Sequence, residues 1–110
     1  MDTLLIELRD SLKQLTQNLL ARIDSVCMKC ESGDEMESLT FWLEDLSMLT
    51  ETIIILSRNN FIDFEMDLFN EKADLLLDKV EERDNLFVGD LLKYDIKPLL
   101  SYLDRCITND

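Results

Sequence analysis

Two cysteines three residues apart are the residues of this chain best suited to chemistry. They form the CxxC motif Cys27-Met-Lys-Cys30, and Cys106 supplies a third thiol. A redox CxxC needs a lowered thiol pKa, which a helix N-terminus provides, but this pair falls in the last turn of an expected helix. Zinc takes four ligands, and only three thiols exist. Apolar packing is therefore the main interpretation, and a thiol- or metal-dependent sensor using Cys27, Cys30 and Cys106 is the alternative.

Other groups that could support catalysis are scarce. The chain has no histidine, which removes the commonest general base and metal ligand. The acids of Asp63-Phe-Glu-Met-Asp67 alternate as in a calcium loop, but Leu68 stands where such a loop needs glycine. Two glycines are too few for a phosphate-binding loop. We therefore expect a protein that is not an enzyme and that carries no cofactor.

Charge is spread unevenly along the sequence. The net charge is −13, and residues 31–84 carry 16 acids and 4 bases, whereas residues 1–30 are balanced. Such a field repels phosphates and anionic lipids, so we expect binding neither to nucleic acid nor to a membrane. The acids are either a solvated surface or a face for a partner protein with a basic surface.

Glycine and proline are so rare that few connections, and hence a few long elements, are expected. The 110 residues are enough for one domain, 1–110, with a single core. Apolar residues recur every three or four positions, as in amphipathic helices. This pattern predicts an all-α, antiparallel up-down-up-down four-helix bundle, with helices at about 3–31, 35–58, 61–83 and 86–106. No secretory signal or membrane-length apolar run is visible, so a cytoplasmic location is expected.

Short breaks separate these helices. Gly33 suits a left-handed cap and Asp34 an N-cap, and Asn60 is a plausible N-cap for the third helix. In that third helix the residues expected to face inward are Phe61, Phe64, Leu68, Phe69, Ala73, Leu76, Leu77 and Val80.

The second helix has more apolar residues than one buried face requires. Its main row includes Trp42 and Leu46, and a thinner row of Phe41, Met48 and Ile55 lies on another side. Such a wide apolar arc suggests contacts on two sides. The thinner row either packs across a homodimer or onto a partner helix, or is buried within the bundle.

The segment GDLLKYDIKPLL, residues 89–100, places a proline inside a helical pattern. Apolar residues continue past Pro98 without a change of step, which predicts one helix that is kinked at Pro98. The alternative is a break at Lys97 with Pro98 opening a new helix. Gly89 is tolerable in such a helix if a neighbouring helix approaches closely.

The stretch Asp90-Leu-Leu-Lys-Tyr-Asp-Ile-Lys-Pro-Leu-Leu resembles the closing-helix motif of a small helical domain family found in Firmicutes, although Lys93 and Lys97 depart from its acid-rich spacing. The resemblance covers about 11 residues and implies a bacterial helical domain with no assigned activity. If the motif is functional, Asp90, Tyr94, Asp95 and Pro98 form one polar patch. The alternative is that the motif only reflects helix packing.

These observations favour a non-enzymatic protein–protein interaction module. It would act as an adaptor, chaperone, inhibitor or immunity-type protein. The candidate partner-binding residues are Phe41, Met48, Ile55, Asp90, Tyr94, Asp95 and Pro98.

Overall fold

The structure, a computed structural model, describes residues 3–33 and 37–108. Within them all regular structure is helical, which confirms the all-α four-helix prediction. The elements are α1 Thr3–Ser32, α2 Glu37–Arg58, α3 Met66–Glu81, α4 Asn85–Leu91, the π-helical turn η1 Leu92–Ile96, and α5 Lys97–Thr108. The last three follow one another without a break and form the fourth long helical segment. Among the described residues no helix is long and apolar enough to cross a membrane.

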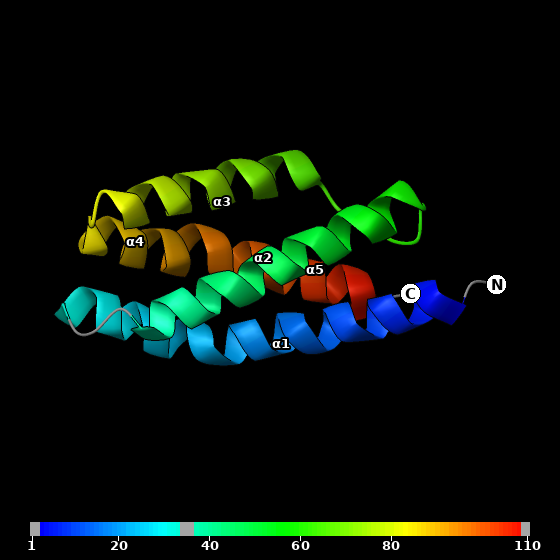
Figure 1. Cartoon of the computed structure of the whole chain (residues 1–110), viewed down its shortest axis with the longest axis horizontal. Helices are drawn as coiled ribbons and strands as arrows, with labels where there is room; N and C mark the ends of the chain where they lie inside the picture. Colours follow the sequence, from blue (N-terminus) through cyan, green and yellow to red (C-terminus); the bar gives the residue numbers. More distant parts are fainter. Residues whose placement is uncertain (1–2, 34–36, 109–110) are drawn as a thin grey trace.

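α1 organises the bundle. It packs against α2, α4, η1 and α5, whereas α3 packs mainly against α4 and η1. In Figure 1 the chain runs leftward along α1, returns along α2, runs leftward again along α3, and closes along α4 and α5. α2 therefore has α1 on one side and α3 on the other, and its contacts with the rest of the bundle are made largely through α1.

The core consists of the apolar rows that the sequence shows. Leu12, Leu19 and Ile23 of α1 are buried, as are Trp42 of α2 and Leu100 of α5. The Trp42 indole N–H donates to the carbonyl of Leu19 at 3.0 Å, so its polar atom is satisfied inside the core. This contact fixes α2 on α1.

The third helix starts later than the sequence predicts. It begins at Met66 rather than at residue 61, because Asn60 closes α2 instead of opening α3. Asn60 has a φ of 55°, and the Phe61 N–H donates to the carbonyl of Leu56 at 2.9 Å. This is the left-handed C-terminal cap that asparagine can adopt. The expectation of an N-cap at Asn60 was therefore wrong.

The other breaks show similar capping. Gly33 has a φ of 75°, as expected for a left-handed cap. Arg83, with a φ of 59°, closes α3, and the side chain of Asp84 accepts from the Phe87 N–H at 3.3 Å to cap α4. The proposed N-cap at Asp34 lies outside the described residues.

The chain stays helical through Pro98, and it does so by widening one turn. In η1 the Lys97 N–H donates to the carbonyl of Leu92, five residues earlier. A proline in an ordinary helix crowds the carbonyl four residues before it, here that of Tyr94. A wider turn gives this carbonyl room. The predicted bend of the helix axis at Pro98 stays a prediction.

Candidate functional site

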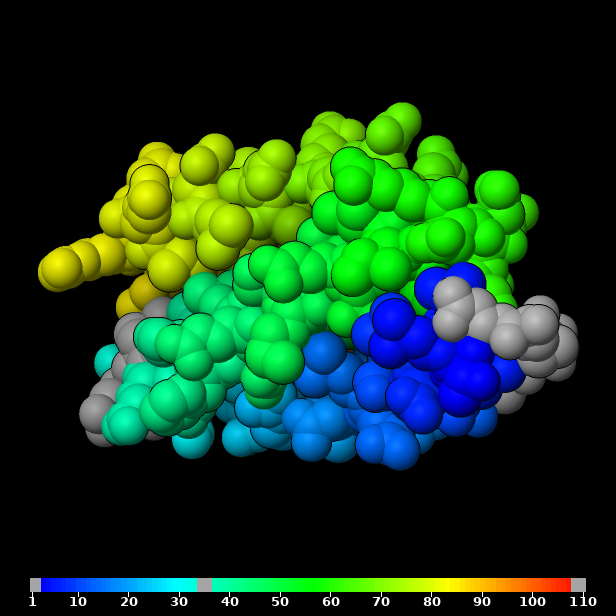
Figure 2. Space-filling view, turned by 45° about the vertical axis from the view of Figure 1, so that its right-hand side comes forward, coloured from blue at the N-terminus to red at the C-terminus, as the bar shows by residue number. Residues whose placement is uncertain are grey.

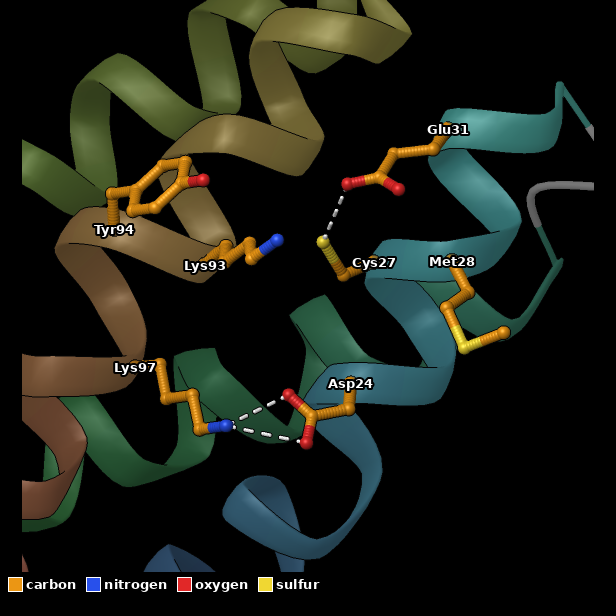
Figure 3. A pocket seen from close by; sticks show the side chains of 7 residues that line it. All are labelled: Asp24, Cys27, Met28, Glu31, Lys93, Tyr94 and Lys97. Carbon is orange, nitrogen blue, oxygen red and sulfur yellow. Dashed lines mark hydrogen bonds and ion pairs between the residues drawn. The ribbon is translucent and has the colours of Figure 1, made fainter.

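Several chemically capable side chains meet where the end of α1 faces η1. A pocket of about 520 Å³ opens there. Its lining residues are Asp24, Cys27, Met28, Glu31, Lys93, Tyr94 and Lys97. Figure 3 shows that the first four come from α1, that the other three come from η1 and the start of α5, and that Cys27 and Lys93 point toward each other. The fold thus joins the CxxC motif to the 89–100 segment.

Gly89 allows this junction to close. A Cβ atom at this position would lie 3.3 Å from Cγ of Glu31 and 3.8 Å from Sγ of Cys27. The Cys27 thiol is 3.2 Å from the Gly89 carbonyl, to which it can donate. The close approach of a neighbouring helix, which would explain a glycine here, is therefore made by α1.

The environment of Cys27 makes its thiol a poor nucleophile. Burial, followed by the hydrogen bond and charge of Glu31, raises the pKa of Cys27 to about 11. Burial likewise raises the pKa of Cys30. A reactive cysteine needs the opposite shift, because the thiolate is the nucleophile and the metal ligand. Both thiols stay protonated at neutral pH.

The charged groups of the pocket are only partly paired. Nζ of Lys97 lies 2.9 Å and 3.2 Å from the two carboxylate oxygens of Asp24. Nζ of Lys93 lies 5.4 Å from the centre of the Tyr94 ring. The pocket is thus an open notch with one exposed ion pair and one protonated thiol.

The third thiol belongs to a different cavity. Cys106 lines a cavity of about 640 Å³ together with Asn60, Phe61 and Tyr102. The pKa of Tyr102 is raised, chiefly by its hydrogen bond to Cys106. Across residues 3–33 and 37–108, no three histidine, cysteine or acidic side chains group in a way that could hold a metal ion.

The polar residues of the 89–100 segment do not share one cavity. Tyr94 lines the Cys27 pocket, whereas Asp95 lies 3.9 Å from Nζ of Lys72 on α3. Asp90 and Pro98 are exposed. Asp95 is therefore directed toward α3 rather than into the Cys27 pocket with Tyr94, and the grouping of Asp90, Tyr94 and Pro98 stays a prediction.

The thinner apolar row of α2 is exposed. Phe41, Met48 and Ile55 have exposed fractions of 54%, 58% and 44%, and they recur every seven residues along one side of the helix. We call these three residues the α2 ridge. The alternative that the bundle buries them is wrong.

The side of α2 that faces α3 carries a groove that the sequence does not predict. It encloses about 260 Å³ between α2 and α3. Its lining residues are Leu43, Leu46, Ser47, Thr50, Glu51, Asn70, Ala73, Asp74 and Leu77. We call it the α2–α3 groove. Leu77, expected to face inward, has an exposed fraction of 49%, and Leu68 one of 40%. The wide apolar arc of α2 indicates contacts on two sides of this helix, but it does not locate the groove.

Two carboxylates, Glu51 of α2 and Asp74 of α3, line this groove, and each belongs to a row of acids along its helix. Asp67, Asp74 and Glu81 recur every seven residues on α3, and Glu44 and Glu51 do so on α2; all are exposed. None of the five makes an ion pair in the part of the chain that the structure describes.

The lysines of α3 are engaged elsewhere. Lys72 is directed to Asp95 of η1. Nζ of Lys79 lies 4.8 Å from the centre of the Phe87 ring of α4 and 3.3 Å from a carboxylate oxygen of Glu82. The acids on the groove side of α3 are therefore not neutralised by its own lysines.

Comparison with known proteins gives no relative from which a function could be inferred: no protein-family model, no curated protein and no solved structure matches this chain. The resemblance to a Firmicutes helical domain stays a prediction.

Proposed function

We propose that this chain is a non-enzymatic protein–protein interaction module. It binds an amphipathic helix of a partner protein, with lysines or arginines beside its apolar face, in the α2–α3 groove. The observation that carries the proposal is an open apolar groove lined by two unpaired carboxylates, Glu51 and Asp74, each of which belongs to a row of acids along its helix.

The apolar lining of the groove provides the driving force. Leu43 is only partly buried and Leu77 remains half exposed, although both lie between two helices. Figure 2 shows α2 in green with α3 in yellow and yellow-green beside it, so this side of α2 reaches the surface. A helix laid in the groove would remove these side chains from water, at about 25 cal/mol per Å² of apolar surface. Helix-in-groove binding of this kind uses anchor residues three, four and seven positions apart.

The carboxylate rows determine the kind of helix. An acidic or neutral helix would bring apolar surface to the groove but would leave Asp74 and Glu51 facing like charges or nothing. A helix with basic residues on both flanks would pair with them. Because such pairs are exposed, they contribute more to selectivity and association rate than to affinity.

A pair of synthetic peptides tests the proposal. Both are amphipathic helices with the same leucines; one carries lysines on its flanks and the other carries glutamates at those positions. We expect the lysine peptide to bind, measured by fluorescence anisotropy, with an affinity that falls as salt is added. The glutamate peptide should not bind.

Two matched variants locate the binding site. Leu77→Lys puts a charge in the groove and should abolish binding, whereas Leu86→Lys, on an exposed leucine of α4 (67% exposed), should leave it unchanged. Circular dichroism establishes that both variants fold. Equal loss in both variants, or equal binding of the two peptides, would contradict the proposal.

The thiol-sensor alternative has less support. The raised pKa of Cys27 and Cys30 opposes redox or metal chemistry at neutral pH, and Cys106 lines a different cavity. Titration of the native protein with a thiol reagent at pH 7 distinguishes the two functions. Fast reaction of Cys27 would favour the sensor.

A further inference from the structure

The α2 ridge lies beside a part of α1 that carries no charge. Positions 11, 14, 18, 21, 25 and 28 step by three or four along one side of α1. They are Ser11, Gln14, Asn18, Ala21, Ser25 and Met28; all are exposed and none is charged. We call this row the uncharged strip of α1. In a chain with 32% charged residues, an uncharged row that spans most of a helix needs an explanation.

The ridge and the strip are adjacent and in register. Lys29 donates to Ser38 at 2.9 Å, and Arg22, seven residues earlier, pairs with Asp45, seven residues later. α1 and α2 therefore run in opposite directions at this seam. By the same register, Phe41, Met48 and Ile55 fall at the levels of residues 26, 19 and 12 of α1, each one residue from a member of the strip: Ser25, Asn18 and Ser11 respectively.

The two surfaces are complementary in shape. The ridge presents three large apolar side chains at seven-residue intervals. At the same intervals, and within one residue of the same levels, the strip presents Ser11, Asn18 and Ser25, which are smaller. From Phe41 to Ile55 on the ridge, and from Ser11 to Ser25 on the strip, the contact extends over 14 residue steps, or about 21 Å. A two-fold axis would lay the ridge of one copy on the strip of the other, and would do so twice.

Charge favours this pairing over a contact between other acidic faces. Two copies that each carry −13 repel wherever carboxylates meet. Glu44 and Glu51 flank the ridge, but the strip opposite them holds amides, hydroxyls and apolar groups. The ridge therefore meets the strip itself without facing a carboxylate, and at the seam between the two rows Asp45 is paired with Arg22 of its own copy.

We propose that the occupant of this face is a second copy of the chain, in an isologous dimer. Met48 of each copy lies against Asn18 of the other, at the centre of the contact. This dimer uses a side of α2 that the row of Glu44 and Glu51 separates from the α2–α3 groove, so the groove stays free in both copies.

The size of the face sets the expected strength of the dimer. The face formed by α2 and the stretch of α1 beside it is about 33 Å long, the length of α2, and about 20 Å wide, the width of two helices. This corresponds to about 650 Å² per copy, somewhat below the roughly 800 Å² per partner of a standard interface. We therefore expect a dimer with micromolar affinity that dissociates on dilution.

Sedimentation velocity over a concentration series tests the proposal. The chain should sediment as a dimer at high concentration and as a monomer on dilution. Met48→Glu should raise the dissociation constant at least tenfold. Leu86→Glu, the same change on the exposed leucine of α4, should leave it unchanged.

A rescue variant separates the proposed contact from a general effect of charge. Asn18→Lys combined with Met48→Glu places an ion pair at each of the two central contacts and should restore part of the dimer. The proposal is overturned if the unaltered chain stays monomeric at about 1 mM. It is also overturned if Leu86→Glu weakens the dimer as much as Met48→Glu does, or if the double variant is no better than Met48→Glu alone.

Discussion

The two outer sides of α2 differ in shape and in charge. On the side of α1, the α2 ridge projects beside an uncharged strip. On the side of α3, apolar side chains line a hollow together with two unpaired carboxylates, Glu51 and Asp74, each of which belongs to a row of acids along its helix. The ridge is exposed apolar surface of the 22-residue α2 itself. On the groove side, the half-exposed leucine is Leu77 of α3.

The difference indicates two kinds of occupant. A projecting row beside a flat, neutral row is complementary to itself, and therefore suits a second copy. A hollow with acidic borders is not complementary to itself, because a second copy would bring more acid. It suits a partner of opposite charge. The same helix can thus assemble the protein on one side and bind a partner on the other.

The core side of α2 provides the reference for both outer sides. Ile53 is fully buried and Ile55, two residues later, is 44% exposed. Ile53→Ala should lower the free energy of unfolding by about 2–5 kcal/mol, because it leaves a cavity. Ile55→Ala should change that of the monomer by less than about 1 kcal/mol. Urea unfolding at low protein concentration measures both. A similar loss in both variants would mean that the ridge belongs to the core.

Neutralising the carboxylates should affect one outer side alone. In the variant Asp67→Asn, Asp74→Asn, Glu81→Gln, we expect roughly tenfold weaker binding of the lysine peptide, since exposed ion pairs contribute about 0.2–1 kcal/mol each. Added salt should then have less effect on binding. The dimer dissociation constant should not change. Neutralising Asp90 on α4, by Asp90→Asn, is the control. If Asp90→Asn weakens peptide binding as much per removed charge as the triple variant does, net charge rather than the groove attracts the peptide.

The Cys27 pocket should contribute to stability rather than to binding. The folded pKa of Cys27 is about 11, against an ordinary value of 9.0. The unfolded thiol therefore ionises first as pH rises. The stability that the folded state gains by keeping the Cys27 thiol protonated is complete below pH 9 and is lost between pH 9 and about 11. Urea unfolding of the unaltered chain and of Cys27→Ser, at pH 8 and pH 10.5, isolates this term. A constant difference between the two proteins would contradict the raised pKa.

The smallest expected effect is that of the Lys97–Asp24 ion pair. Both side chains are exposed, so Lys97→Met should lower stability by no more than about 1 kcal/mol. It should leave both the dimer and peptide binding unchanged. A double-mutant cycle with Asp24→Asn measures the pair itself. A coupling of several kcal/mol would show that this pocket is a stronger junction than we infer.

The helices could be predicted from the sequence because apolar spacing reports them directly. The rows containing Leu12, Trp42 and Leu100 are buried as expected. The start of α3 could not be predicted, because Asn60 suits either the end of one helix or the start of the next. Its left-handed conformation depends on the Phe61 hydrogen bond to Leu56.

The candidate site was less predictable than the helices. The exposed row Phe41, Met48 and Ile55 could be recognised by its spacing, although spacing alone could not decide its burial. The α2–α3 groove could not be found in this way. Leu77 lies in register with the inward residues of α3, and its exposure depends on how far α3 lies from α2. Helix spacing of that kind is set by the packing of α3 against α4 and η1.

The central claim is that the two sides of α2 bind independently, and sedimentation velocity with a labelled lysine peptide tests it most directly. At high protein concentration, we expect the label to sediment with the dimer. Met48→Glu should move the label to the monomer without loss of bound peptide. Leu77→Lys should release the peptide from an intact dimer. If either variant lost both the dimer and the bound peptide, the claim would be contradicted, because one surface would then mediate both dimerisation and peptide binding.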